Sequence, residues 1–467
     1  MAEATYTFPP DFLWGTATSA HQVEGDNKNN DWWDWEQKRD GRVFDDHVSG
    51  EAAGWWSGQA EWDIERMAAL NNNAHRMSIE WSRIEPREGE WNHTALDRYR
   101  EILKKMHAEG IQPMITLHHF TNPMWFVHRG GWLHPDSPKW FAAFVKKAVA
   151  ELADLCSTWC TINEPNVYAS YSYFLGKWPP GMTDLSAYFR VLKHLMLAHA
   201  AAYSIIHDLQ PQAQVGLAKH MTLWQPHTSS PLDRLATRMI DRAFNGVSLD
   251  VLETGEWRPI VGRRERLDQC RNTLDWIGLN YYARYDVSFS LRALKSLGIT
   301  YGVRAGVERG PEDWGELYPA GIFENIKRLY KQFRLPIYIT ENGLPDEHDN
   351  RRARWIAESL RHVWRAVNFN WPVKGYYFWS LIDNFEWAEG YDPRFRFGLY
   401  GVNFDTQERT LRKSGEFYAE IAGTGKLSSE MVSRYAPGLE KKLFPGTGPE
   451  DFQVVDLGSP AAPALFV

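Results

Sequence analysis

The chain has 467 residues, of which 43% are hydrophobic and 24% are charged, an ordinary balance for a globular protein with a sizeable core. Its net charge of −7 argues against nucleic acid or an anionic membrane as its main partner. The most apolar long stretch, from Leu185 to Ile206, is interrupted by charged and imidazole side chains, so we expect a buried helix there and no membrane span.

Along the chain, short β-like runs alternate with longer stretches whose apolar residues recur at helical spacing. We predict eight strands, at Phe12–Ala17, Ala74–Glu80, Gln112–His118, Thr158–Ile162, Gln214–Ala218, Trp276–Asn280, Ile337–Thr340 and Gly375–Ser380. The predicted helices between them include Leu96–Gly110, Lys139–Leu155, Ser186–Leu209, Gly321–Phe333 and Arg351–Asn368. Strand–helix alternation favours a parallel sheet, and eight repeats favour its closure. The sequence therefore predicts a single α/β domain, a (β/α)8 TIM barrel with elaborated loops, over residues 1–422.

The C-terminal residues 423–467 have a different composition. They are rich in glycine and contain Pro437, Pro445, Pro449, Pro460 and Pro463. We expect an extended tail without regular structure, either packed on the barrel or poorly ordered.

The cysteines and the N-terminal residues indicate in which cellular compartment the protein is expected. Cys156, Cys160 and Cys270 have no disulfide-like spacing, and we expect reduced, buried thiols. Residues Met1 to Pro10 lack a basic stretch followed by an apolar core, so no secretory signal is expected. Both features predict a cytoplasmic protein. The oligomeric state stays open, and a homo-oligomer is compatible with the sequence.

Two glutamates each end an apolar, strand-like run. Glu164 lies in the stretch Thr161-Ile162-Asn163-Glu164-Pro165, and Glu341 lies in Tyr338-Ile339-Thr340-Glu341-Asn342-Gly343. Glycosidic bond cleavage needs two such carboxyl groups, one to protonate the leaving oxygen and one to attack the sugar or activate water. The pair alone is compatible with either inverting or retaining chemistry.

The other predicted strands also end in polar groups. In TIM barrels the catalytic groups lie at the carboxyl ends of the strands, so these side chains should form a ring. Such a ring, with tryptophan walls, suits a polyhydroxylated ligand better than a metal ion, because His118 and His119 are adjacent on a strand and point to opposite faces. We expect no metal and no cofactor. The ring comprises Gln22, Glu24, Glu80, His118, His119, Asn163, Glu164, His220, Asn280, Tyr281, Tyr282, Glu341, Asn342, Asp383, Asn384 and Glu386, beside Trp379 and Trp387.

Seven ordered motifs carry a resemblance to a known family. They are Phe12–Thr18 with Gln22–Gly25, Trp81–Ile84, Thr116–Phe120, Asn163–Pro165, Asn280–Tyr282, Thr340–Gly343, and Trp379–Leu381 with Asp383–Trp387. From Phe12 to about Tyr418 the chain resembles the β-glycosidases of glycoside hydrolase family 1, which are (β/α)8 barrels.

The resemblance implies a role for each candidate residue. Glu164 is expected to be the general acid/base, with a raised pKa, and Glu341 the nucleophile of a retaining reaction, kept anionic by Arg76 and Tyr282. The expected sugar-binding residues are Gln22, His119, Asn163, Asn280, Tyr282, Trp379, Glu386 and Trp387.

The implied function is a retaining, exo-acting β-glycosidase that removes terminal β-D-glycosyl residues from small β-glycosides or short oligosaccharides. A β-glucosidase fits best, with β-galactosidase or β-fucosidase activity beside it. The carboxylate of Glu386 argues against 6-phosphorylated sugars. A transglycosylating enzyme and a catalytically silent sugar-binding barrel stay as alternatives.

Two departures from the family pattern leave the aglycone open. Trp314 lies one position earlier than the usual tryptophan before Glu316-Leu317-Tyr318-Pro319, because Gly315 intervenes. The segment Asp392-Pro393-Arg394-Phe395 lengthens the loop before Phe397, so either Phe395 or Phe397 could close the pocket.

Overall fold

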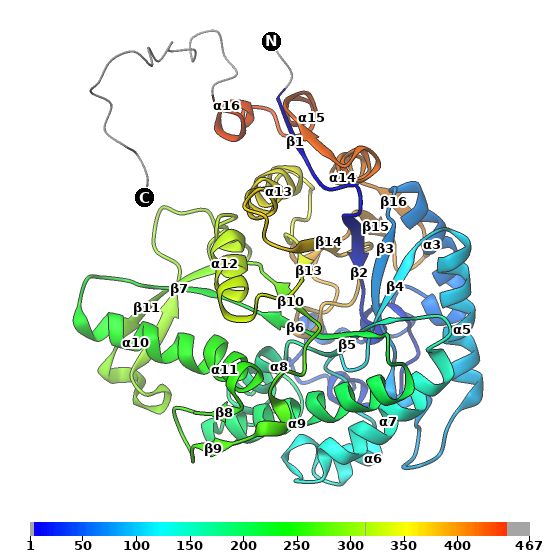
Figure 1. The fold of residues 1–467 in the computed structure, drawn as a ribbon, viewed down its shortest axis with the longest axis vertical. Coiled ribbons are helices and arrows are strands. Elements are labelled where there is room, and N and C mark those ends of the chain that lie inside the picture. Colours follow the sequence, from blue (N-terminus) through cyan, green and yellow to red (C-terminus); the bar gives the residue numbers. More distant parts are fainter. Residues whose placement is uncertain (1–3, 313, 446–467) are drawn as a thin grey trace.

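A closed barrel of eight parallel strands forms the centre of the computed structural model, which describes residues 4–312 and 314–445, without the side chains of residues 294 and 295 (Figure 1). In chain order the strands are β2 (Leu13–Ala17), β3 (Ala74–Ser78), β4 (Gln112–Thr116), β5 (Thr158–Asn163), β6 (Gln214–His220), β10 (Trp276–Asn280), β13 (Ile337–Asn342) and β14 (Val373–Trp379). Each strand pairs with the next one in the chain, and β14 pairs with β2. The predicted (β/α)8 fold is confirmed.

Helices surround the barrel, and the five predicted ones are present within three residues at each end. The helices that cover the strands include α3 (Ala60–Ala69), α5 (His93–Ala108), α7 (Ser137–Leu152), α9 (Leu185–Leu209), α11 (Val247–Thr254), α12 (Gly321–Phe333) and α13 (Arg352–Asn368). In α5 the Asn92 side chain accepts a hydrogen bond from the N–H of Ala95, which caps the helix, and its buried face is apolar. Helical periodicity, together with a side-chain cap at the start of α5 and of α9, explains why these helices could be predicted.

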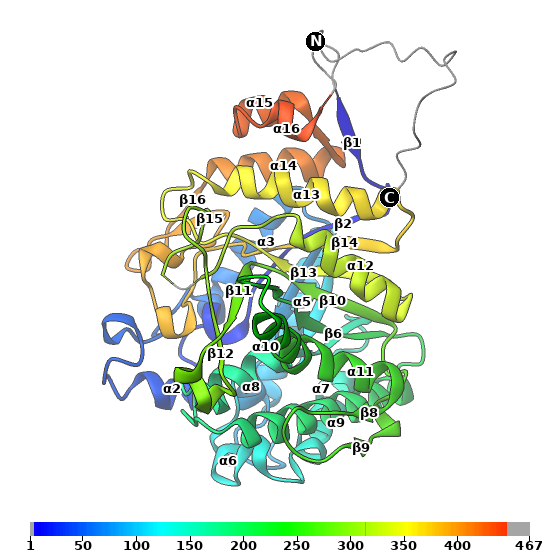
Figure 2. The same cartoon turned by 90° about the vertical axis from the view of Figure 1, so that its left-hand side faces the viewer.

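The loops after β5, β6 and β10 contain structure that the sequence pattern did not indicate. Helix α8 (Pro165–Tyr173) follows β5 directly, and α10 (Pro231–Asp241) follows the short strand β7 (Leu223–Pro226). Strands β11 (Arg284–Phe289) and β12 (Ile299–Gly302) join β7 in a three-stranded sheet of order β12-β11-β7. Figure 2 shows α10, β11 and β12 together on one side of the barrel. These elements build one wall of the cavity described below.

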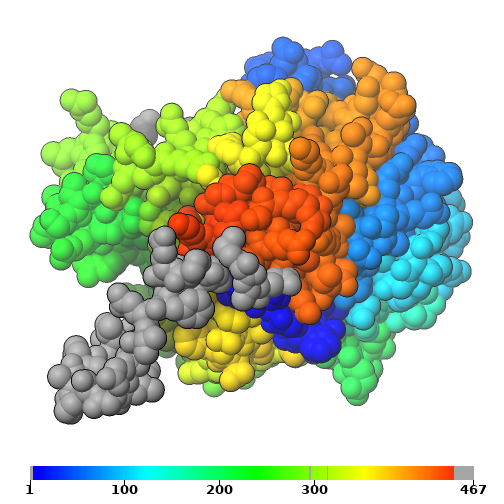
Figure 3. All heavy atoms as spheres, turned by 90° about the horizontal axis from the view of Figure 1, so that it is seen from above, coloured from blue at the N-terminus to red at the C-terminus, as the bar shows by residue number. Residues whose placement is uncertain are grey.

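The C-terminal segment differs from the predicted irregular tail as far as Leu443. Helix α14 (Lys413–Thr424) is followed by strand β17 (Lys426–Ser428), which pairs antiparallel with β1 (Thr5–Thr7). Helices α15 (Ser429–Tyr435) and α16 (Glu440–Leu443) come after β17. Leu427 is fully buried, and Ser428 caps α15. In Figure 3 these orange and red residues lie against the dark blue N-terminal segment. The prediction was wrong here because Pro437 lies between two helices and interrupts neither of them. Residues 446–467 lie outside the described part of the chain, and the domain boundary at residue 422 stays a prediction.

The remaining sequence predictions concern the thiols and the membrane. Cys156, Cys160 and Cys270 are buried free thiols, as predicted. Within residues 4–312 and 314–445, the structure contains no helix with the length and apolar composition of a membrane span.

Candidate active site

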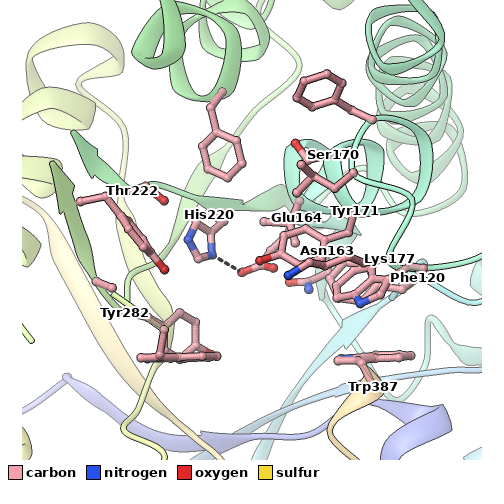
Figure 4. Close-up of a pocket in the computed structure, with 18 of the residues that line it drawn as sticks. Phe120, Asn163, Glu164, Ser170, Tyr171, Lys177, His220, Thr222, Tyr282 and Trp387 are labelled. Atoms are coloured by element: carbon pink, nitrogen blue, oxygen red, sulfur yellow. Dashed lines mark hydrogen bonds and ion pairs between the residues drawn. The ribbon is translucent and has the colours of Figure 1, made fainter. Parts of the chain in front are cut away.

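Glu164 stands where β5 turns into α8. Its neighbour Asn163 donates its backbone N–H to the His118 carbonyl at 2.8 Å, and the N–H of Glu164 itself donates to the Ala218 carbonyl at 2.8 Å. The exit of β5 is therefore tied to both neighbouring strands. Glu164 has a φ of 43°, in the left-handed region that non-glycine residues rarely adopt, and Pro165 begins the helix immediately afterwards. This turn directs the carboxylate into the cavity at the end of the barrel (Figure 4).

Glu341 lies near the end of β13 and is 4% exposed. Arg76 Nη1 donates to its Oε1 at 2.6 Å, and the Tyr282 hydroxyl donates to its Oε2 at 2.7 Å. Just beyond it, a Cβ on Gly343 would come within 1.9 Å of the Trp379 carbonyl oxygen, so only glycine fits where β13 and β14 approach. Both oxygens of Glu341 thus accept hydrogen bonds, one from β3 and one from the loop after β10.

A chain of hydrogen bonds joins the two carboxylates. Arg76 Nη2 donates to Asn163 Oδ1 at 2.6 Å, so one guanidinium contacts both Glu341 and the residue beside Glu164. Asn280 Nδ2 lies 3.2 Å from the same Asn163 oxygen and 2.8 Å from Glu164 Oε1. Strands β3, β5, β10 and β13 therefore position the two carboxylates relative to each other.

The predicted sugar-binding residues meet in one cavity of about 290 Å³ beside this chain. Gln22 Nε2 donates to Glu386 Oε2 at 3.1 Å. The ring of His119 lies nearly parallel to those of Trp379 and Trp387, at centroid distances of 5.9 and 6.0 Å. Eight of the eleven predicted site residues line the cavity, namely His119, Asn163, Glu164, Tyr282, Glu341, Trp379, Glu386 and Trp387. The other three, Gln22, Arg76 and Asn280, lie behind the lining and hydrogen-bond to it.

His220 was predicted to lie in the ring at the strand exits, but the sequence assigned it no role. It ends β6, and its Nδ1 lies 2.9 Å from Glu164 Oε1 (Figure 4), while its ring stacks on Tyr282 at 5.8 Å. Its place at a strand exit was the only sequence signal. Asn280 and His220 both bond to Oε1 of Glu164, and Oε2 has no hydrogen bond to any residue in the described ranges. Oε2 is the oxygen left for a ligand.

The protonation of the pair differs from the prediction. Burial raises the pKa of Glu341 to about 7, with a further rise from the Glu164 charge, against the lowering effect of Arg76 and Tyr282. Burial also raises the pKa of Glu164, but the His220 charge and the hydrogen bonds from His220 and Asn280 outweigh it, so that this pKa lies below its usual value. The prediction of a raised pKa at Glu164 was wrong because it did not include His220. Since the two groups repel each other, they titrate as a pair that loses its last proton at about pH 7.

The pKa of a third buried carboxyl group in the cavity, that of Glu386, is also shifted. Burial raises the pKa of Glu386 well above its usual value, and the nearby Glu389 and Glu341 charges raise it further.

No group of three histidine, cysteine, aspartate or glutamate residues within residues 4–312 and 314–445 is arranged to hold a metal ion. His118, which is adjacent to the site residue His119, turns away and bonds to Asn122 through Nε2 at 3.1 Å. The imidazole of His119 therefore lines the cavity, and that of His118 is buried outside the lining.

The sequence profile described as Glycosyl hydrolase family 1 matches residues 4–426. The chain belongs to glycosyl hydrolase family 1. A family 1 chain with this barrel is a glycoside hydrolase that acts on β-glycosides, so the predicted enzyme class is confirmed.

Individual relatives cover nearly all of this family 1 chain. The solved β-glycosidase from Pyrococcus horikoshii matches it with a TM-score of 0.86 and 37% identity, over 94% of this chain and 100% of that one. Beta-glucosidase A of Thermotoga maritima is 30% identical over 441 residues, which cover 89% of this chain and 97% of the relative. The 6-phospho-beta-glucosidase GmuD of Bacillus subtilis is 30% identical over 457 residues, which cover 89% and 98%. The names of these relatives differ in substrate, so family membership alone leaves the sugar open.

The two departures from the family pattern both lie at this site. Trp314 lines the cavity, with its ring 5.6 Å from that of Tyr282. Phe395 also lines the cavity, whereas Phe397 packs behind it, against Trp314 and Tyr282. Of the two phenylalanines, Phe395 faces the ligand space.

Proposed function

We propose that this chain is a retaining, exo-acting β-glycosidase that releases terminal β-D-glycosyl residues, with β-glucosides as its main substrates and β-galactosides or β-fucosides as further ones. The proposal rests on a difference in hydrogen bonding between the two carboxylates. Glu341 has a donor on each oxygen, which suits a nucleophile that must stay anionic. Glu164 has both donors on Oε1, which leaves Oε2 to exchange a proton with the substrate.

In the first step, Glu341 attacks the anomeric carbon while Glu164 Oε2 protonates the leaving oxygen. This geometry needs a carboxyl separation of about 5–5.5 Å. Before the bond breaks, the one proton of the pair lies on Glu164 Oε2 and the negative charge on Glu341, because the Glu341 anion stabilises the positive charge that develops at the anomeric carbon. In the second step, Glu341 is esterified and uncharged, and Glu164 takes a proton from the water that releases the sugar.

The rest of the cavity is assigned to the terminal sugar. Asn163 would bond to the 2-hydroxyl, where hydrogen bonds strengthen in the transition state, and Asn280 would orient it. Trp379 offers an apolar plane under the ring, and Gln22, His119 and Trp387 would surround the 3-hydroxyl. Glu386 would bond to the distal hydroxyls. Because the Glu389 and Glu341 charges already act on Glu386, a phosphate at the 6-position would bring further negative charge to an acidic part of the cavity, which disfavours a 6-phospho substrate.

The test combines product stereochemistry with carboxylate variants. We expect the wild-type enzyme to release the β-anomer first, as observed by NMR, and Glu341→Gln and Glu164→Gln to lose nearly all hydrolysis. Azide should rescue Glu341→Gly with an α-glycosyl azide product and Glu164→Gly with a β-glycosyl azide. Release of the α-anomer by the wild type would refute the retaining assignment.

A panel of nitrophenyl β-glycosides, compared by kcat/KM, identifies the sugar. Highest activity on a 6-phosphoglucoside would contradict the role given to Glu386. A transglycosylating enzyme would instead give coupled products at high acceptor concentration. No turnover of any panel member would favour the silent barrel.

A further inference from the structure

Strand β6 departs from the pattern of a barrel strand at the residue before His220. Successive side chains of a strand point to opposite faces, so positions 215, 217 and 219 share one face. Val215 and Leu217 belong to the hydrophobic core between the strands and the helices, and Ala218 belongs to the core inside the barrel. An apolar residue is therefore expected at position 219, where the chain has Lys219. Residues that break a local rule in this way are expected at functional sites.

Lys219 is fully buried, and its ammonium group is bound by backbone carbonyls. Its Nζ donates to the carbonyl oxygens of His220 and Phe244, each at 2.9 Å. Within residues 4–312 and 314–445, no carboxylate forms an ion pair with this nitrogen. Burial lowers the pKa of Lys219 well below its usual value, which shows that the charged form is poorly solvated. Stability alone does not explain a lysine here, because an apolar side chain would avoid this desolvation cost.

The two carbonyls that Lys219 binds belong to neighbouring residues beside Glu164. The imidazole of His220 places Nδ1 2.9 Å from Glu164 Oε1. The ring of Phe244 lies edge-on to that imidazole, at a centroid distance of 5.8 Å. One nitrogen therefore fixes the backbone that carries the imidazole and the backbone of a ring that packs against it.

The His220 carbonyl has a second buried donor. Asn166 follows Glu164 by two residues, is fully buried, and donates from Nδ2 to the His220 carbonyl at 3.1 Å. The next carbonyl along the chain, that of Met221, accepts from Asn325 Nδ2, also at 3.1 Å. Side chains thus hold the backbone where β6 ends, and two of their donors converge on His220.

We propose that Lys219 is a positioning residue for the acid/base: its Nζ holds the backbone of His220 so that the imidazole keeps its hydrogen bond to Glu164 Oε1 and Oε2 stays free for the leaving oxygen. Lys219 is not among the residues that line the cavity, so it acts through His220 and touches no substrate. This inference rests on the proposed function, because it uses Glu164 as the acid/base.

The first test is Lys219→Met, which keeps an unbranched side chain and removes the donor. The full-length enzyme is assayed with phenyl β-D-glucoside, a poor leaving group, and with 2,4-dinitrophenyl β-D-glucoside, which leaves without protonation. We expect kcat/KM to fall about fivefold with the phenyl glucoside and less than about twofold with the dinitrophenyl glucoside. An equal fall with both substrates, or no fall in a folded variant, would overturn the proposal.

A double-mutant cycle tests whether Lys219 acts through His220. When His220 is already phenylalanine, the imidazole that Lys219 positions is absent. Lys219→Met added to His220→Phe should therefore lower kcat/KM for the phenyl glucoside by less than about a further twofold. If the falls caused by the two single substitutions multiply in the double variant, the residues act independently and the proposal is wrong.

Two asparagine variants separate positioning of His220 from general loosening of the strand end. Asn325→Leu, the control, removes a buried donor from the Met221 carbonyl and should leave the phenyl-to-dinitrophenyl ratio of kcat/KM unchanged. A change as large as that in Lys219→Met would contradict a specific role. Asn166→Leu removes the other donor to His220 and should lower the ratio as Lys219→Met does. It replaces Lys219→Met if that variant fails to fold, and an unchanged ratio there would count against the proposal.

Failure of the proposed function is distinguishable from failure of this inference. If the wild type hydrolyses no glucoside, the function fails, and positioning is tested by crystal structures of the wild type and the folded variant. We expect the separation between His220 Nδ1 and Glu164 Oε1 to exceed about 3.5 Å in Lys219→Met, which is too long for a hydrogen bond. A separation that stays at 2.9 Å would overturn the role of Lys219.

Discussion

Replacement of His220 by phenylalanine tests whether the second donor on Glu164 matters for proton transfer. Phenylalanine keeps a ring that can stack on Tyr282, but it removes the 2.9 Å contact to Glu164 Oε1. Asn280 then remains as the donor to that oxygen. The substitution therefore removes one hydrogen bond and changes little of the packing.

The size of the effect follows from the environment of the contact. A hydrogen bond to a charged group contributes about 1.5–3 kcal/mol. Because the His220 side chain is 19% exposed, we take the lower end, about 1.5 kcal/mol, which corresponds to about a tenfold loss of rate. The loss should appear where Glu164 must deliver a proton, and so only with poor leaving groups.

The assay is kcat/KM over a series of aryl β-glucosides, since this parameter reports the steps up to cleavage of the glycosidic bond. We expect about a tenfold fall with nearly unactivated phenols and less than a twofold fall with dinitrophenol, which leaves without protonation. The His220 charge lowers the pKa of Glu164, so its removal should raise that pKa and extend activity to higher pH. An equal fall for all leaving groups, or an alkaline limb that moves to lower pH, would refute the reasoning.

Three further predictions address the nucleophile, the pH profile and the C-terminal segment. Arg76→Met should lower kcat at least a hundredfold, because Glu341 loses its charged donor. The control Arg409→Met breaks a different buried ion pair, with Asp63, so it should lower Tm but leave kcat of the folded enzyme unchanged. The kcat/KM of the wild type should fall as pH rises through about 7, where the carboxylate pair loses its last proton, and a profile that stays flat to pH 9 would contradict that assignment. Leu427→Ala in β17 should lower the free energy of unfolding, measured in urea, by about 2–5 kcal/mol, because Leu427 is fully buried. Leu411→Ala, at a 40% exposed position, should lower it by less than about 0.5 kcal/mol. Equal losses in the two variants would contradict a contribution of β17 to the hydrophobic core.

The barrel could be predicted because its signals are local. Most strands are short apolar runs and each covering helix has its own apolar periodicity, so a window of a dozen residues identifies the element. The sheet of β7, β11 and β12 has no such signal, since β7 ends at residue 226 and its partner β11 begins only at residue 284, and both outer strands are half-buried or exposed. Residues 426–443 were missed for a related reason, because β17 is specified by pairing with β1 at the other end of the chain.

Within the site, residue types could be predicted but not protonation. Glu164 and Glu341 were expected near one another because strand exits converge at one end of a barrel, and Arg76 was expected beside Glu341 from the family resemblance. The pKa order of the two glutamates depends on their burial and on the charges beside them, above all that of His220 at Glu164. His220 and Glu164 are joined by a 2.9 Å contact between separate strands, and no pattern in the chain reports that distance.

The different roles of two chemically identical side chains are imposed by the strands around them. The ladders β5–β6, β10–β13 and β13–β14 each shift register at or near the carboxyl end, and such shifts re-aim the side chains that follow. Glu341 thereby meets donors from β3 and the end of β10 on both oxygens, and Glu164 meets Asn280 and His220 on one. A chain that kept both glutamate motifs but lost Arg76 and Tyr282 would therefore have two carboxylates without a nucleophile, so the four supporting residues are as diagnostic of activity as the glutamates themselves.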